Sequence, residues 1–87
     1  MKEQYILKLF IKFLKENKAY EEYILRLNSH KGGKEESINY IVKQCINKPK
    51  DLIISAFPWI SLKYINSKLE WYDLHRQWYF YYLKKME

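Results

Sequence analysis

Two histidines, one cysteine and a Gly-Gly-Lys sequence are the residues of this chain with the greatest potential for chemistry. A histidine that acts as a general base or a metal ligand needs a carboxylate, a nucleophile or further ligands held beside it. Asp73 is two positions from His75 and so lies on a different helix face, and His30 falls in an expected loop. Neither HxxxH nor CxxC occurs, so the spacing predicts no catalytic residue and no metal ligand.

Cys45 and the Gly32-Gly33-Lys34 sequence fit structural roles better than chemical ones. Cys45 lies on the apolar stripe of an expected helix, where a thiol packs as a small hydrophobic group. It is the only cysteine, which excludes an intramolecular disulfide and is typical of a reducing compartment. A phosphate-binding loop needs an earlier glycine and a Ser or Thr after the lysine, and this chain lacks both. We therefore predict a protein that is not an enzyme and uses no cofactor.

The elements that position these residues are predicted to be helices, arranged in a single domain over residues 1–87. The chain holds only 2 Gly and 2 Pro, which are too few for the many turns of a β-rich fold. Apolar residues recur at helical spacing in five segments. The expected helices cover residues 2–16, 19–28, 34–47, 49–57 and 68–85. The predicted fold class is all-α, a compact bundle of four to five helices with a long aromatic C-terminal helix.

Local signals mark the helix ends and the connections between them. Asn17 is expected to end the first helix because Asn tolerates the left-handed conformation, and Pro49 is expected to open the short fourth helix. Ser67-Lys68-Leu69-Glu70 matches a capping box at the start of the last helix. Residues 28–33 are expected to form a flexible loop, and residues 58–66 a turn with a short helical piece.

The C-terminal helix carries more aromatic rings than one buried face requires. One stripe contains Trp71, Leu74, Trp78, Tyr81 and Tyr82, and a second contains Leu69, Tyr72, Tyr79, Leu83 and Met86. Either both stripes are core, or one stays exposed and forms a protein interface. Tyr, Trp and Arg are enriched at interface hot spots, and Arg76 lies beside these rings. The candidate interaction residues are Trp71, Tyr72, His75, Arg76, Tyr79 and Tyr82.

The net charge of +6 is spread along the chain. It divides into +2 for residues 1–16, +1 for 17–33, +1 for 34–57 and +2 for 58–87. A nucleic-acid groove normally shows a basic stripe or cluster. Nucleic-acid binding is therefore possible but not favoured.

Three stretches of the chain follow a recognisable pattern. Residues 13–27 read FLKENxxYExxIxxL, residues 49–59 read PxDxIxxAFxW, and the last helix places Trp71, Leu74 and Trp78 before Tyr82-Leu83. Together they resemble small uncharacterised proteins of tailed bacteriophages and their Gram-negative or gut bacterial hosts. Ser55 stands where that group commonly has Gly, and Ser61-Leu62-Lys63-Tyr64 replaces its P-E-G-like turn.

The resemblance implies a phage origin and a protein that acts by protein-protein binding. The favoured role is a small structural or accessory component of the virion, associated with the capsid or tail. One alternative is an early inhibitor of a host or defence protein, and another is a basic nucleic-acid-binding helical module. The expected partners are a capsid, tail or host protein, or a second copy of the chain.

The expected location is the bacterial cytoplasm or the virion, without secretion. No apolar run approaches the ~20 residues that span a bilayer, so no transmembrane segment is expected. Lys8, Lys12 and Lys15 interrupt the apolar pattern near the N-terminus, which is not typical of a secretion signal.

Overall fold

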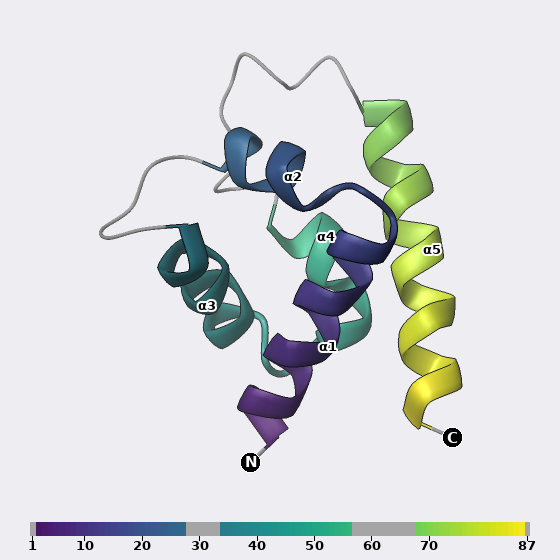
Figure 1. The fold of residues 1–87 in the computed structure, drawn as a ribbon. Helices are drawn as coiled ribbons and strands as arrows, with labels where there is room; N and C mark the ends of the chain where they lie inside the picture. The colour runs from purple at the N-terminus through teal and green to yellow at the C-terminus, as the bar shows by residue number, and fades with distance from the viewer. Residues whose placement is uncertain (1, 28–33, 57–67, 87) are drawn as a thin grey trace.

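The computed structural model describes residues 2–27, 34–56 and 68–86, and within these ranges it contains helices and turns but no strand. The helices are α1 (Lys2–Glu16), α2 (Tyr20–Arg26), α3 (Lys34–Gln44), the 3₁₀ helix η1 (Pro49–Asp51), α4 (Leu52–Ser55) and α5 (Lys68–Met86). Helix α5 runs along one side of the molecule, and α1 and α4 lie between it and α3 (Figure 1). The prediction of an all-α bundle with a long C-terminal helix is confirmed.

The core is one cluster of buried apolar side chains to which each of the α-helices or its following turn contributes. Its members are Ile6, Leu9, Phe10, Phe13, Leu14, Tyr23, Leu27, Ile38, Ile41, Val42, Cys45, Leu52, Ile53, Ala56, Trp71, Trp78 and Tyr82. The ring of Phe10 meets those of Tyr23 and Trp78 edge-on, with centroids 5.3 and 4.9 Å apart. Such aromatic pairs contribute about 0.5–1.5 kcal/mol beyond the area they bury, so α1 holds α2 and α5 in place.

Helix α1 ends differently from the expectation. Asn17 was expected to take the left-handed conformation, but Lys18 does so, with φ of 56°. The amide of Ala19 donates to the carbonyl of Leu14 at 2.7 Å, and that of Lys18 to the carbonyl of Lys15 at 3.1 Å. This is the Schellman arrangement. Asn17 contributes through its side chain instead, which donates to the carbonyl of Phe13 at 2.9 Å.

The short fourth helix is also built differently. A single helix over residues 49–57 was expected, but Pro49–Asp51 forms a 3₁₀ turn and only Leu52–Ser55 is α-helical. Helix α3 likewise stops at Gln44, three residues before the expected end, and residues 45–47 form a turn. The predictions for residues 28–33 and 58–66 and for the capping box lie outside the described residues.

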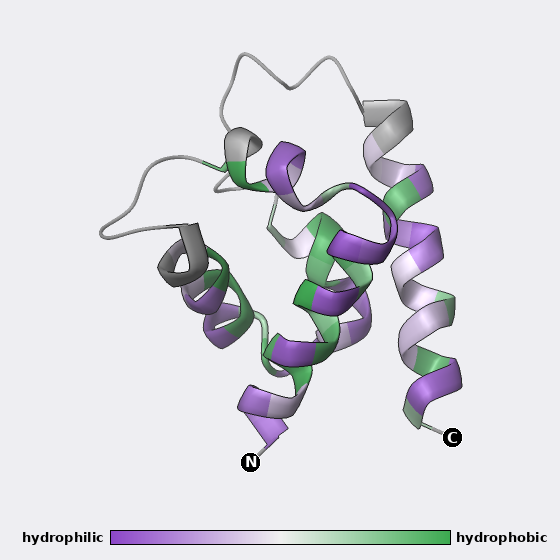
Figure 2. Ribbon diagram, in the orientation of Figure 1, coloured by the Kyte–Doolittle hydropathy of each residue, from purple (hydrophilic) through white to green (hydrophobic). Residues whose placement is uncertain are grey.

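Hydropathy is distributed differently along α4 and α5. Helix α4 is mostly apolar, whereas α5 is largely pale or hydrophilic on the scale of Figure 2, because Tyr, Trp and His score at or below neutral. Yet α5 supplies Trp71, Trp78 and Tyr82 to the core. Its buried side is therefore made of large rings that carry polar atoms, and those atoms need hydrogen-bond partners.

Candidate protein interface on α5

The inner face of α5 is anchored by its two tryptophans. The indole nitrogen of Trp71 donates to the carbonyl of Ile53 at 3.0 Å, and that of Trp78 donates to the carbonyl of Pro49 at 2.7 Å. The last carbonyls of a short helix such as α4 are available to outside donors, and the Trp71 indole uses one of them. The two bonds set the rotation of α5 about its own axis.

Other positions of α5 carry exposed large hydrophobic side chains. The exposed fraction is 53% for Tyr72, 62% for Phe80 and 44% for Met86. Among the described residues the only other exposed large hydrophobic side chain is Tyr5 of α1. Three of four such side chains thus belong to one helix, which is the arrangement expected of an interaction surface.

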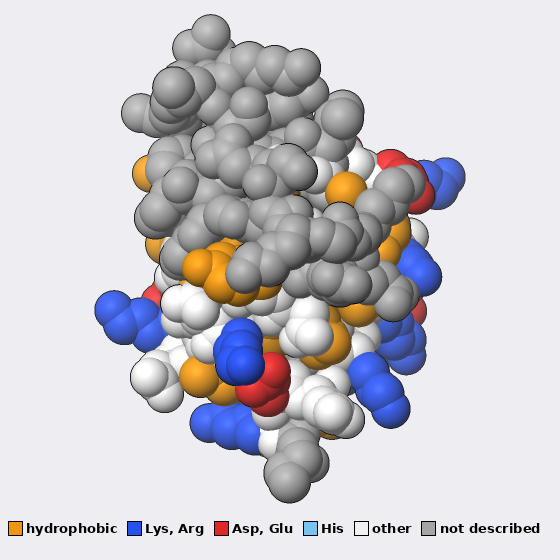
Figure 3. All heavy atoms as spheres, turned by 90° about the vertical axis from the view of Figure 1, so that its left-hand side faces the viewer, with side chains coloured by type: hydrophobic (Ala, Val, Ile, Leu, Met, Phe, Trp, Pro, Cys, Tyr) orange, Lys and Arg blue, Asp and Glu red, His pale blue; other side chains and the backbone are white. Residues whose placement is uncertain are grey.

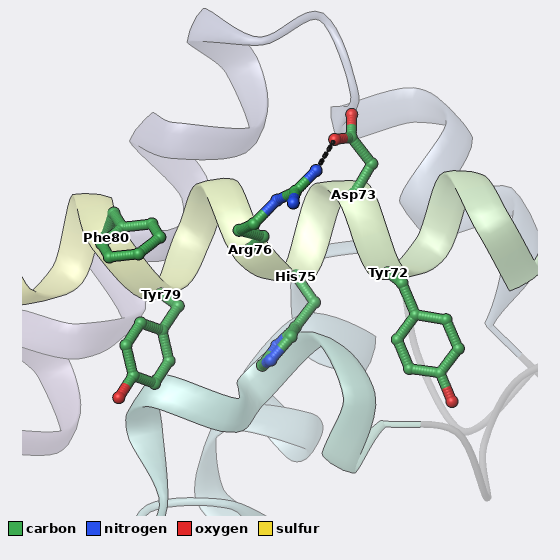
Figure 4. Close-up of a pocket in the computed structure, with 6 residues that line it drawn as sticks. All are labelled: Tyr72, Asp73, His75, Arg76, Tyr79 and Phe80. Carbon is green, nitrogen blue, oxygen red and sulfur yellow. Dashed lines mark hydrogen bonds and ion pairs between the residues drawn. The ribbon is translucent and has the colours of Figure 1, made fainter.

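Helix α5 also borders a shallow, open hollow of about 550 Å³. We define the outer face of α5 by the residues that line it, which are Tyr72, Asp73, His75, Arg76, Tyr79 and Phe80. In Figure 4, Tyr72, His75 and Tyr79 extend to one side of the helix, whereas Arg76 and Asp73 lie together on the other. The His75 and Tyr79 rings meet edge-on at 6.1 Å, and those of Tyr79 and Phe80 at 5.5 Å.

The charges on the outer face are partly balanced within α5. Arg76 Nη2 lies 3.2 Å from Asp73 Oδ1, and Gln77 Nε2 donates to Asp73 Oδ2 at 2.9 Å. Lys50 places its Nζ 5.5 Å from the centroid of the Tyr79 ring. Because exposed ion pairs contribute at most about 1 kcal/mol, the Asp73–Arg76 pair can be rearranged when a partner binds.

The structure brings four of the six predicted interaction residues together, namely Tyr72, His75, Arg76 and Tyr79. Trp71 and Tyr82 are buried in the core. The prediction that these two residues belong to an interaction surface was therefore wrong. Phe80 was missed by the sequence reasoning because it belongs to neither stripe. Its position four residues after Arg76, which places the two on neighbouring parts of one helix face, was the available signal.

The alternative in which both stripes of α5 are core is wrong for the described residues. The Trp71 stripe is buried or half-buried throughout, whereas Tyr72 and Met86 of the other stripe are exposed. Tyr79 and Leu83 are half-buried. The aromatic rings of α5 that are not part of the core therefore lie wholly or partly at the surface.

The side chains that could do chemistry either lie away from the outer face of α5 or lack a hydrogen-bond partner. The thiol of Cys45 is buried, and burial raises its pKa, which disfavours the reactive thiolate. The Nδ1 atom of His75 is buried and has no hydrogen-bond partner. In the described part of the chain, no three His, Cys, Asp or Glu side chains gather closely enough to hold a metal ion.

Basic side chains are dispersed over the described part of the face drawn in Figure 3. On the face drawn in Figure 3, Lys and Arg side chains lie at both edges and in the middle, with apolar and uncharged side chains between them. This view agrees with the even distribution of charge along the sequence. No focused basic groove is seen on the described part of this face.

The fold and the outer face of α5 define a small all-α domain with an exposed aromatic helix face. Comparison of the chain with protein-family models, with curated proteins and with solved structures found no match. No helix in the described ranges is long and apolar enough to cross a membrane. The function must therefore be argued from the site itself.

Proposed function

We propose that this domain acts by binding another protein through the outer face of α5. The observation that carries the proposal is the exposure of two aromatic rings, Tyr72 and Phe80, on a helix whose inner face is held by two indole hydrogen bonds. Rigidly held aromatic side chains lose little conformational entropy on binding, which is why they are common interface anchors. Arg76 and Tyr79 between them add the residue types that interface hot spots prefer.

We further propose that the domain is a small virion component of a tailed phage, in contact with a capsid or tail protein. The sequence resemblance over residues 13–27 and 49–59 and the last helix supports this role. A helical domain of 10.8 kDa with an exposed aromatic helix face suits an accessory protein that attaches to a larger assembly.

Affinity capture with surface variants tests the binding proposal. The tagged chain, a Tyr72→Ala/Phe80→Ala variant and a Tyr5→Ala variant are used in parallel, and retained proteins are identified by mass spectrometry. Tyr5 is a matched control because it is an exposed aromatic residue on a different helix. The unchanged chain and the Tyr5→Ala variant should retain the same protein, and the double variant should lose it.

Circular dichroism of each variant shows whether the helices are kept. Equal capture by a folded double variant would contradict the proposed surface. Mass spectrometry of purified phage particles tests the virion role separately. Absence of the chain from particles, together with capture of a single host protein, would replace that role by inhibition of a host factor.

A further inference from the structure

Three residues of the outer face of α5, together with Leu83 and Met86 further along the helix, follow the spacing of a coiled-coil seam. Tyr72, Arg76, Tyr79, Leu83 and Met86 are separated by four, three, four and three residues, which is the alternation that packs one helix against another. Tyr72, Arg76 and Met86 are exposed and Tyr79 and Leu83 are half-buried, so the described helices cover this seam only in part. The buried side of α5 packs on α1, η1 and α4, and no helix among the described residues covers the exposed part of the seam.

The seam is complementary to itself when two copies run antiparallel. If Arg76 of one copy lies opposite Tyr79 of the second copy, then Tyr72 lies opposite Leu83, and both pairs recur on the other side of the two-fold axis. The first pair places a guanidinium beside a tyrosine ring, an attractive cation–π arrangement. The second pair places a ring against an aliphatic side chain. Such repetition is what an isologous two-fold interface requires.

The charges near the axis are balanced in part. Each Arg76 is paired with Asp73 of its own helix at 3.2 Å, whereas Lys50 Nζ lies 5.5 Å from the centroid of the Tyr79 ring that Arg76 of the second copy would meet. The remaining net charge of +6 on each copy is dispersed, and its repulsion is screened by salt.

The available area is sufficient for a modest dimer. An aromatic side chain can bury roughly 150–250 Å², so Tyr72, Phe80 and Met86 leave on the order of 300 Å² exposed per copy. Arg76 and the half-buried Tyr79 and Leu83 contribute a smaller area, which brings two copies to about 1,000 Å² in total, the lower end for a specific interface. The 19 residues of α5 span about 28 Å, long enough for four such layers.

We propose that a second copy of this chain occupies the outer face of α5, with the two α5 helices antiparallel and related by a two-fold axis. This inference rests on the proposed function, in which the same face binds protein, and it names the partner. Arg76 specifies the register, because moving the helices by one layer would remove it from the Tyr79 ring.

Sedimentation velocity or light scattering over a range of concentrations tests the dimer. The unchanged chain should rise from 10.8 kDa toward twice that mass, and more readily at higher salt. Arg76→Glu should remain a monomer. Lys84→Glu is the matched control, because it makes the same charge change at an exposed position of α5 outside the seam, and it should still dimerise.

Cysteine crosslinking tests the register. A Tyr72→Cys chain mixed with a Leu83→Cys chain should crosslink through a short bismaleimide, whereas either chain alone should not. In either chain alone the two cysteines would lie 11 residues apart along antiparallel helices, which is about 16 Å. Crosslinking of Tyr72→Cys with itself, without the mixed product, would overturn the antiparallel register.

The outcomes also separate this inference from the proposed function. A chain that stays monomeric at every concentration, yet captures a different protein in a manner that depends on Tyr72 and Phe80, overturns the dimer and leaves the binding face intact. A dimer that forms equally with Arg76→Glu and Lys84→Glu overturns the inference by placing the contact elsewhere.

Discussion

The indole nitrogen of Trp78 donates a 2.7 Å hydrogen bond to the carbonyl oxygen of Pro49, 29 residues earlier in the chain. The same carbonyl accepts the amide of Leu52 at the end of η1. The ring of Trp78 also meets Phe10 and Phe13 of α1. One residue of α5 therefore joins both neighbouring parts of the bundle and directs Tyr72 and Phe80 outward.

Replacing Trp78 by Phe should lower the free energy of unfolding by about 2–4 kcal/mol. The change leaves the Pro49 carbonyl with one partner fewer and creates a cavity in the core. Urea unfolding followed by circular dichroism measures the effect. Tyr72→Phe, at an exposed position of the same helix, is the control and should stay within about 0.5 kcal/mol. Equal stability of both variants would mean that the Trp78 bond contributes nothing.

Replacing Lys18 by Gly should stabilise the domain by about 0.5–1 kcal/mol. Lys18 has φ of 56°, a conformation that costs a residue with a Cβ atom but not glycine. Lys12→Gly makes the same chemical change at an exposed site inside α1 and should destabilise by about 1 kcal/mol. Thermal unfolding of the two variants should therefore show shifts of opposite sign. Shifts of the same sign would contradict the Schellman ending.

Replacing Tyr23 by Phe should leave the domain as stable or make it more stable, by on the order of 1 kcal/mol. The Tyr23 hydroxyl is buried and has no hydrogen-bond partner, and such a group costs about 1–3 kcal/mol. The ring contacts with Phe10 and Trp71 are kept in the variant. Denaturant unfolding at neutral pH measures the difference, and a clear loss of stability would show that the hydroxyl has a partner.

Alkaline pH should destabilise the domain through the same residue. Burial raises the pKa of Tyr23 well above its usual value of 10.0, with a smaller contribution from Cys45. The unfolded chain therefore loses this proton above about pH 10 while the folded chain keeps it, and stability falls as pH rises. Each such group contributes up to about 1.4 kcal/mol per pH unit. Tyr23→Phe should show a shallower decline between about pH 10 and 11, and an unchanged slope would be the contrary result.

Cys45 should react slowly with thiol reagents in the folded domain. Its thiol is buried and its pKa is raised by desolvation, so reaction requires opening of the core. A Gln44→Cys variant supplies an exposed thiol at the adjacent position. In a colorimetric thiol assay this variant should release one equivalent rapidly and the second slowly. Rapid reaction of the unchanged chain would show that α3 opens readily.

The helices and their buried stripes could be predicted from the sequence with little error. Ile38, Ile41 and Val42 of α3 and Leu52 and Ile53 of α4 are all buried, and their helical spacing can be recognised in the sequence because periodicity is a local property of the chain. The residues at which the helices end were less predictable from the sequence. At the end of α1, either Asn17 or Lys18 could take the left-handed conformation. Which of them does so depends on which carbonyls accept hydrogen bonds from the amides of Lys18 and Ala19.

The sequence alone determined that α5 is a helix with two aromatic stripes, since spacing places Trp71 and Trp78 in one stripe and Tyr72 and Tyr79 in a second, roughly a third of a turn away. Only the tertiary structure decided which stripe is core. Both stripes are similar in size and apolar character, so periodicity cannot rank them. The carbonyls of Ile53 and Pro49 accept the two indole N–H groups, and the hydrogen bonds turn the tryptophans inward and leave Tyr72 at the surface.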